Sequence, residues 1–258
     1  MHALKVERLR KLYPSMQAKG QEVLAIEDVS LEVNKNEFCS ILGHSGCGKT
    51  TLLNLIAGFE VPTSGRIECA GKTVSGPGAD RSMVFQDYAL FPWLTVFDNI
   101  AFGLKVKGTT SKEINEIVLR FAALVGLSQF THHYPHQLSG GMRQRVSIAR
   151  ALVVDPTVLL MDEPFAALDA QNRALMQAEM IRILNEESKT VVLVTHSIEE
   201  AINLSDVIVV MTRRPGKVKQ IIRVPEPRKM VEDTPPYLTI RRQIRDLIAG
   251  EHDDSEGR

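Results

Sequence analysis

A glycine-rich run near the N-terminal part of the chain has the composition of a polyphosphate site. The run consists of Gly43, His44, Ser45, Gly46, Cys47, Gly48, Lys49 and Thr50, and Thr51 follows it. Glycines let the backbone turn so that successive amides point inward, and a helix that starts at such a turn adds the positive end of its dipole. An apolar stretch at 38–42 precedes the run and a helical pattern follows it, so the segment matches a P-loop.

Individual side chains of this loop have separable expected roles. Lys49 is expected to reach the outer phosphates, and the Thr50 hydroxyl is expected to bind Mg²⁺. His44 and Cys47 occupy variable positions and should contribute their backbone amides. The alternative is a glycine-rich turn with an incidental lysine, which the strand-loop-helix context disfavours.

A second group that could do chemistry is a pair of carboxylates at the end of a buried strand. Residues 158–161 are apolar, and Asp162 and Glu163 follow directly. An acidic side chain in this position suits the Mg²⁺ beside a P-loop, and a neighbouring carboxylate could act as general base toward water. Asp162 is therefore the expected metal ligand and Glu163 the expected base. Without the P-loop, such a pair would more often cap the following turn.

A third segment, residues 138–144, again combines a helix start with glycines. Ser139 suits an N-cap, while Gly140 and Gly141 leave backbone amides accessible at the start of the next helix. The segment resembles the signature motif of ABC ATPases, although Met142 stands where that family commonly has glutamine. The resemblance implies that this second phosphate site meets ATP held by the opposite subunit, so that two chains sandwich two nucleotides.

The other motifs of that family follow in order along the chain. Tyr13 resembles the aromatic residue that stacks on adenine, Gln86 the glutamine that contacts Mg²⁺ and the attacking water, and His196 the histidine that senses the γ-phosphate. Residues 167–169, ending in Asp169, resemble the loop that touches the partner subunit. Taken alone, each has a plainer interpretation: a surface tyrosine, a polar strand end, a structural histidine and a simple turn.

The elements that must position these residues indicate an α/β protein. The chain has 258 residues, 44% of them hydrophobic, which suits one large domain. Short apolar runs at 38–42, 158–161, 191–195 and 207–211 predict buried strands, and helical spacing occurs at 113–125 and 142–152. The family resemblance implies a P-loop NTPase of the ABC type, with a RecA-like, mostly parallel sheet, an antiparallel β part and an inserted helical subdomain.

The domain limits expected from these patterns are an ATPase domain at 1–222, with the helical insertion at about 88–152, and a short extension at 223–258. Proline and charge predict that 225–236 is irregular. Residues 238–248 have the spacing of one amphipathic helix, and 251–258 are expected to be a disordered tail.

Composition excludes several classes of protein. Lys plus Arg and Asp plus Glu number 31 each, so no net field favours nucleic acid, and no nucleic-acid partner is expected. The three cysteines lack metal-type spacing and suit reduced, packed thiols. The N-terminus lacks the apolar core of a signal peptide, and the apolar runs fall short of the roughly 20 residues that span a bilayer. Membrane contact is therefore expected through a partner.

Finer motifs resemble importer ATPases for nitrate, sulfonates and taurine. These motifs are GPGADR at 76–81, LFPWLTV at 90–96, DEPFAALDA at 162–170 and RRPG at 213–216. The resemblance implies ATP and Mg²⁺ as cofactors. It also implies a second copy of the chain, transmembrane permease subunits, a periplasmic or extracellular solute-binding protein, and a peripheral position on the cytoplasmic face of the inner cell membrane.

An aromatic segment that follows Gln86 is the expected permease contact. Phe91 and Trp93 could be its anchors, because large aromatic side chains carry much interface energy, or they could pack within the helical lobe. Three rivals remain for the chain as a whole. They are an ABC ATPase acting on DNA or ribosomes, a nucleotide-binding regulatory module without turnover, and an exporter ATPase. The transported solute is not fixed by the sequence.

Overall fold

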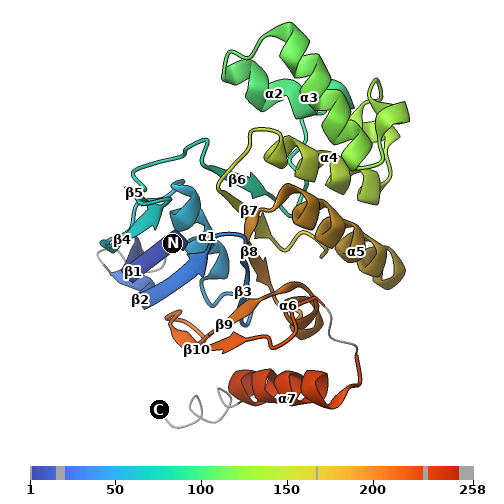
Figure 1. Ribbon diagram of the computed structural model, residues 1–258. Helices are drawn as coiled ribbons and strands as arrows, with labels where there is room; N and C mark the ends of the chain where they lie inside the picture. The colour runs from blue at the N-terminus through green and yellow to red at the C-terminus, as the bar shows by residue number, and fades with distance from the viewer. Residues whose placement is uncertain (1, 16–20, 167, 229–231, 250–258) are drawn as a thin grey trace. The chain divides into compact units, whose positions relative to one another are not determined.

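The computed structural model describes residues 2–15, 21–166, 168–228 and 232–249. Two compact units make up the chain: Met1–Gly78 with Thr190–Arg258, and Ala79–Lys189 (Figure 1). The predicted tail at 251–258 and residue Ala167 lie outside the described residues. The predicted helical insertion at 88–152 lies inside the second unit, and the described part of the C-terminal extension lies in the first.

An antiparallel sheet forms one part of the first unit, with strand order β2-β1-β4-β5. Its strands are β1 (His2–Pro14), β2 (Glu22–Asn34), β4 (Ser64–Cys69) and β5 (Lys72–Thr73). Along β2, Val29, Leu31 and Val33 are buried while the residues between them are exposed, the alternation of a sheet with one packed face. This sheet is the antiparallel β part that the family resemblance implies.

A second set of strands in the first unit has the order β10-β9-β3-β8. β3 (Phe38–Leu42) pairs in parallel with β8 (Thr190–Thr195) and with β9 (Val207–Met211), while β10 (Val218–Arg223) runs antiparallel to β9. Every residue of β3, β8 and β9 is buried, as expected for parallel strands covered on both faces. The predicted strands at 38–42, 191–195 and 207–211 are confirmed.

Among its described residues, the first unit has the helices α1 (Lys49–Ala57), α6 (Ile198–Leu204) and α7 (Pro235–Ala249). α7 contains the predicted helix at 238–248. It buries Tyr237, Ile240 and Ile244 in a cluster with side chains of α6 and β9 and with Leu42, the last residue of β3. The strand that leads into the glycine-rich loop therefore shares its packing with the C-terminal helix.

The second unit combines a parallel strand pair with helices. β6 (Arg81–Val84) pairs with β7 (Val158–Asp162), which confirms the predicted strand at 158–161. Around them the chain forms α2 (Val96–Val106), α3 (Ser111–Leu124), α4 (Gly140–Leu152), α5 (Ala170–Glu187) and two short 3₁₀ turns, η1 (Ser128–Phe130) and η2 (Pro135–Gln137). α2 packs against both α3 and α4.

Local sequence explains where these helices begin. Thr110 and Glu113 form a reciprocal capping box at the start of α3, in which each side chain bonds the backbone amide of the other. Thr95 caps α2 by accepting from the Asp98 amide. In the part of the chain that the structure describes, no helix combines the length and the apolar character needed to cross a membrane.

Candidate functional site

The glycine-rich loop joins β3 to α1 in the first unit, and its backbone requires glycine at two positions. Gly46 and Gly48 have φ angles of 77° and 105°, which lie in the left-handed region. A Cβ atom on Gly48 would also come within 2.8 Å of Ile26 Cδ1 and 3.0 Å of the Ala25 carbonyl oxygen. Gly48 is the N-cap of α1 and supplies no side-chain cap, so the helix start keeps the anion-binding character of its first amides.

Lys49 is buried at the centre of this loop. Only 5% of the residue is exposed, and Nζ donates to the carbonyl oxygens of Gly43, at 2.8 Å, and His44, at 2.9 Å. The ammonium group is therefore held against the loop itself by two neutral acceptors. Thr50 and Ser45 are exposed, and Thr51 is half-buried. The loop thus combines a shielded positive charge with accessible hydroxyl groups.

His44 connects the loop to the C-terminal helix. Its Nε2 lies 3.3 Å from the carbonyl oxygen of Ile248, so this nitrogen carries the proton that it donates. Lys219 of β10 donates to the preceding carbonyl, Leu247, at 2.6 Å. Two side chains of the first unit therefore satisfy consecutive carbonyls in the last turn of α7, groups that have no partner within a helix.

Tyr13 lies near the end of β1, opposite Val23 of β2. Its hydroxyl donates to the Glu60 carboxylate, and the ammonium group of Lys11 lies 4.8 Å from the centre of its ring. Burial and the hydrogen bond to Glu60 raise the pKa of Tyr13 to about 12, against the opposing effect of the Thr51 hydroxyl. Tyr13 is thus a neutral donor at physiological pH and not a loosely attached surface residue.

His196 follows β8 directly and is exposed. The residues on both sides of it are fixed: the Thr195 hydroxyl donates to Glu200 at 2.6 Å, and Ser197 caps α6 by accepting from the Glu200 amide at 3.2 Å. The backbone of His196 is therefore fixed between a strand end and a helix cap, while its imidazole is exposed. This arrangement suits a ligand-sensing side chain.

In the second unit, β7 ends with Asp162, the first of the two predicted carboxylates, and Glu163 follows it directly. Asp162 and Glu163 are both half-buried. Glu163 has a φ angle of 43°, a left-handed conformation that costs energy for a residue with a side chain. Its carbonyl oxygen accepts from the Ala166 amide at 3.1 Å, which closes a tight turn after the strand. The strained backbone directs the Glu163 carboxylate differently from a regular continuation of the strand.

Gln86 is exposed and comes two residues after β6. The chain beyond it is held by Arg150 of α4, which donates to the carbonyls of Tyr88, at 3.0 Å, and Ala89, at 2.7 Å. Both Tyr88 and Ala89 have positive φ angles. Burial lowers the pKa of Arg150. Arg150 therefore fixes a strained turn just after Gln86.

The sequence did not identify Arg150 as a site residue, because a basic residue late in a helix usually faces solvent. The available signal was its position one turn beyond Val146 and Ser147, on the buried side of α4.

Ser139 is the N-cap of α4, as predicted, and its hydroxyl oxygen accepts from the Met142 amide at 3.3 Å. Gly140 and Gly141 form the first turn. A cleft of about 530 Å³ lies beside them, and it is lined by Ser139, Gly140, Gly141, Arg145, Leu168 and Asp169, among others. The structure thus brings the signature segment and Asp169 together at one cleft of the second unit.

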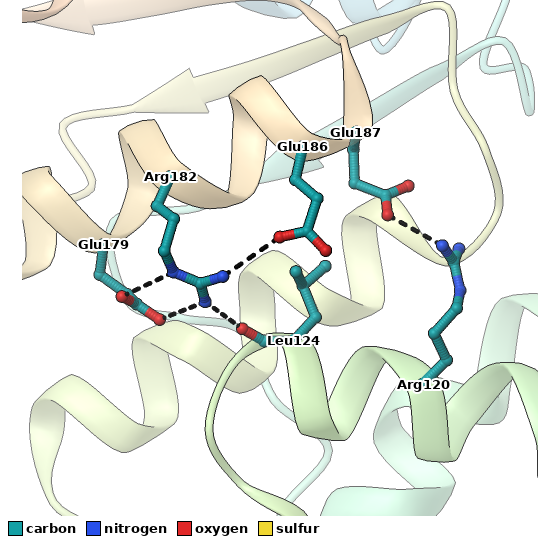
Figure 2. Close-up of polar contacts among 6 residues, drawn as sticks. All are labelled: Arg120, Leu124, Glu179, Arg182, Glu186 and Glu187. Carbon is teal, nitrogen blue, oxygen red and sulfur yellow. Dashed lines mark hydrogen bonds and ion pairs between the residues drawn. The ribbon is translucent and has the colours of Figure 1, made fainter.

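Arginines bind the helices beside this cleft to α3, and Figure 2 shows those that link α5 to α3. Arg182 of α5 pairs with Glu179 and Glu186 of its own helix and donates to the carbonyl of Leu124, at the end of α3. Arg145 of α4 donates to the next carbonyl, Val125, at 3.3 Å. The C-terminal end of α3 is therefore bound by cations from both α4 and α5, where the helix dipole favours positive charge.

An ion pair beside this cluster also joins α3 to α5. Arg120 of α3 pairs with Glu187 of α5 at 3.0 Å. Because α4 starts at the signature segment and α5 starts just after Asp169, these contacts fix the two helices that flank the cleft.

A strand-loop-helix phosphate site with a buried lysine, together with a strand that ends in an Asp-Glu pair, defines a P-loop nucleotide-binding domain. The ABC transporter family model matches residues 26–166, more than half of the chain, so the chain belongs to the ABC transporter family. The resemblance seen in the signature segment is confirmed.

Curated relatives agree with this assignment over nearly the whole chain. An uncharacterised ABC transporter ATP-binding protein of Methanocaldococcus jannaschii is 49% identical, covering 96% of this chain and 92% of that protein. A taurine import ATP-binding protein of Jannaschia sp. is 43% identical, covering 93% and 92%. A bicarbonate transport ATP-binding protein of Synechococcus elongatus is 46% identical over 93% of this chain, but the match spans only 37% of that longer protein.

Solved structures show the same fold and the same activity class. The dimeric structure of an ATP-binding cassette in a post-hydrolysis state, bound to ADP and phosphate, is similar with a TM-score of 0.74 and 30% identity. The match covers 86% of this chain and 99% of that one. The chain is accordingly an ATP-binding domain that hydrolyses ATP, with the predicted α/β fold of the ABC type.

Proposed function

We propose that the chain is the ATP-hydrolysing subunit of an importer for a small anion of the nitrate, sulfonate, taurine or bicarbonate type. The observation that carries the ATPase part is Lys49, a buried cation inside a glycine loop whose backbone only glycine adopts without strain. The solute class rests on relatives named for taurine import and bicarbonate transport. These solutes share a small anionic group.

The site residues divide the chemistry as follows in this proposal. The amides from Gly43 to Thr51 and the Lys49 ammonium group bind the phosphates, and Tyr13 stacks on the base. Thr50, Gln86 and Asp162 offer hydroxyl, amide and carboxylate oxygens, a hard donor set that fits Mg²⁺. When bound, Mg²⁺ neutralises charge on the outer phosphates.

Glu163 takes a proton from a water whose oxygen forms a bond to the γ-phosphorus, while the bond to the β,γ-bridging oxygen breaks. ADP and phosphate are the products. His196 contacts the γ-phosphate and reports its presence.

A second copy of the chain completes the site in this proposal. Ser139, Gly140 and Gly141 would bind ATP held by the other copy, and Asp169 would contact that copy. The shared cleft of about 530 Å³ supports this role because it exposes the start of α4 beside Asp169. Dimeric structures of similar cassettes support the pairing. ATP would favour the closed pair because only there are its phosphates bound from both sides.

An aromatic surface on the second unit is the proposed docking site for a permease. Trp93 is 70% exposed, which supports a contact role for it over packing inside the helical lobe. Phe91 is half-buried, with ring centres 5.7 Å from Trp93 and 4.6 Å from Phe102. A groove of about 440 Å³ adjoins them, lined mainly by apolar side chains including Phe85 and Val154. Such a surface suits an apolar segment of a membrane partner.

The remaining parts of the proposal concern location and the wider assembly. The chain would lie peripherally on the cytoplasmic face of the inner cell membrane, held by the permease. A periplasmic or extracellular solute-binding protein would deliver the anion to the opposite side. The support is the name of the taurine import relative, which specifies import.

The test is uptake of labelled taurine, an alkanesulfonate, nitrate and bicarbonate by cells that carry either the original chain or a Lys49→Ala copy. A Lys5→Ala copy is the matched control, because Lys5 lies on β1 and pairs with Glu7 and Glu32. We expect Lys49→Ala to abolish uptake of one solute and Lys5→Ala to leave it intact. Unchanged uptake of all four solutes with Lys49→Ala would contradict the importer.

A further inference from the structure

The Tyr13 side chain makes more contacts than its position near the end of a strand requires. Lys11 and Tyr13 are two residues apart on β1 and therefore lie on the same side of the strand. The Lys11 ammonium group lies over the Tyr13 ring, 4.8 Å from its centre, a distance at which the cation is attracted to the ring face. One face of the ring thus has a charged neighbour supplied by its own strand.

Glu60 links both side chains. Its carboxylate accepts from the Tyr13 hydroxyl and lies 3.2 Å from Lys11 Nζ. The side chains of Lys11 and Glu60 are only 14% and 26% exposed, so this ion pair is shielded from solvent compared with an ordinary surface pair. Lys11, Tyr13 and Glu60 therefore form a closed triangle of contacts.

The segment that carries Glu60 is itself fastened to β1. Lys11 Nζ donates to the Val61 carbonyl at 2.9 Å. The backbone amide of Thr63 donates to the Arg10 carbonyl at 2.8 Å, and the Thr63 hydroxyl accepts from the Leu12 amide at 3.0 Å. Glu60 follows α1 by three residues, so these bonds connect the helix of the phosphate loop to the strand of Tyr13.

We propose that Lys11 and Glu60 are positioning residues that hold the Tyr13 ring for the nucleotide base, with the face opposite Lys11 presented to the base. The proposal rests on the proposed function, in which Tyr13 stacks on adenine. Lys11 fixes one face of the ring and Glu60 fixes the hydroxyl, so the tilt and the rotation of the ring are both set before ATP arrives. The Tyr13 ring then loses less conformational freedom when the base binds, which favours binding.

The raised pKa of Tyr13, about 12, supports the arrangement, because the hydroxyl keeps its proton and continues to donate to Glu60 across the physiological range. Lys11 balances the carboxylate charge. Without Lys11, the charge of the shielded Glu60 carboxylate would be less compensated, and the Tyr13 ring would lose the cation that lies over one of its faces.

The experiment separates the base from the phosphates. Calorimetric titration of the purified chain gives the dissociation constants for ATP and for inorganic tripolyphosphate, and the ratio of the two reports the contribution of the nucleoside. The variants are Lys11→Met, Glu60→Ala, Tyr13→Phe and Tyr13→Ala. Lys5→Met is the matched control, since it removes a lysine from the same strand that pairs with Glu7. A thermal melt of each variant confirms folding.

We expect Lys11→Met and Glu60→Ala each to weaken ATP binding by about threefold to tenfold, with tripolyphosphate binding unchanged. Lys5→Met should change neither. A Tyr13→Phe/Glu60→Ala double variant should bind ATP no more weakly than Glu60→Ala alone, because both changes break the same hydrogen bond.

Other outcomes would overturn the proposal in distinguishable ways. If Tyr13→Ala weakens ATP binding while Lys11→Met and Glu60→Ala do not, the base stacks on Tyr13 but the two residues do not position it. If Tyr13→Ala also leaves the ratio unchanged, the base does not bind there. Failure of the original chain to bind either ligand would instead refute the proposed nucleotide function.

Discussion

Glu163 has a carboxylate that could act as a general base, and its backbone is strained. Its left-handed conformation follows a strand whose preceding residues, Val158 to Met161, are fully buried, so the strand cannot shift to relieve the strain. Such strain persists only where the surroundings fix it, and it often marks functional positions. In the proposed mechanism, Glu163 is the general base and its neighbour Asp162 binds the metal.

A Glu163→Gln chain should bind ATP with little change and hydrolyse it at least about 100-fold more slowly, because an amide cannot accept the proton of the attacking water. Phosphate release by the purified chain measures this. Glu116→Gln, an exposed glutamate of α3, is the matched control and should keep the original rate. Rapid hydrolysis by Glu163→Gln would show that another group is the base.

Residue contacts that join distant parts of the sequence could not be predicted. Lys11 and Glu60 are 49 positions apart, and Arg150 bonds carbonyls more than 60 positions earlier. No local pattern encodes such pairings. By contrast, the P-loop, the Asp-Glu pair and the Ser139 cap were predictable, because each combines a motif with the strand or helix directly beside it.

At the scale of elements, parallel strands were the most predictable part of the fold. β3, β8 and β9 are buried along their whole length, so each appears in the sequence as a mainly apolar run, interrupted only by Ser40 in β3 and bounded by threonines in β8. The antiparallel sheet was expected only through the family resemblance. β1 changes register at four places in its pairing with β2, and such irregularities disrupt the alternation that identifies a strand.

The junction between α3 and α5 shown in Figure 2 gives a prediction about stability at this scale. Arg182→Met should lower the free energy of unfolding by about 0.5–1 kcal/mol, because the ion pairs are half-exposed and each contributes little. Urea denaturation measures the change. Arg242→Met, at an exposed position of α7, is the control and should change stability by less. A loss above about 3 kcal/mol would mean that the junction is far more stabilising than its exposure allows.

α7 provides a pH-dependent prediction through Tyr237. The residue is 2% exposed, and its hydroxyl has no hydrogen-bond partner among the described residues. Burial, followed by the nearby carboxylates Glu232 and Glu199, raises its pKa from 10 to about 12. The pKa of Tyr237 is higher in the folded chain than in the unfolded chain. The folded chain therefore keeps its full stability with respect to this group below about pH 10, and it loses stability as the pH rises from about 10 through about 12.

Tyr237→Phe should therefore be at least as stable as the original chain near pH 8, with a gain of about 1 kcal/mol from removing the buried hydroxyl. Its advantage should grow between about pH 10 and pH 12. Chemical denaturation at several pH values measures both. Equal pH dependence for the two chains in that window would contradict the raised pKa.

For the molecule as a whole, the structure describes two units, and the candidate site residues are divided between them. The first unit carries the P-loop, Tyr13 and His196, and the second carries the carboxylates, the signature segment and the aromatic surface. In the proposed mechanism, the signature segment of one copy binds ATP held by the P-loop of the other copy, so a single copy completes neither nucleotide site.

The aromatic surface gives a prediction about assembly. Trp93→Ala should weaken association with the permease subunits at least about tenfold, because an exposed aromatic anchor is lost, while hydrolysis by the purified chain stays within about twofold. Co-purification of the transporter measures association. Val106→Ala, a 74% exposed apolar residue of the same unit, should leave association intact. Normal association of Trp93→Ala would remove the docking proposal.

The central claim is that two copies of this chain bind ATP between them and separate after hydrolysis. Sedimentation of the Glu163→Gln chain with and without ATP tests it most directly, because this variant should hold ATP without consuming it. The account predicts a monomer without nucleotide, a dimer with ATP, and a monomer again when Ser139→Arg is added to block the signature segment. A Glu163→Gln chain that binds ATP and stays monomeric would contradict the account.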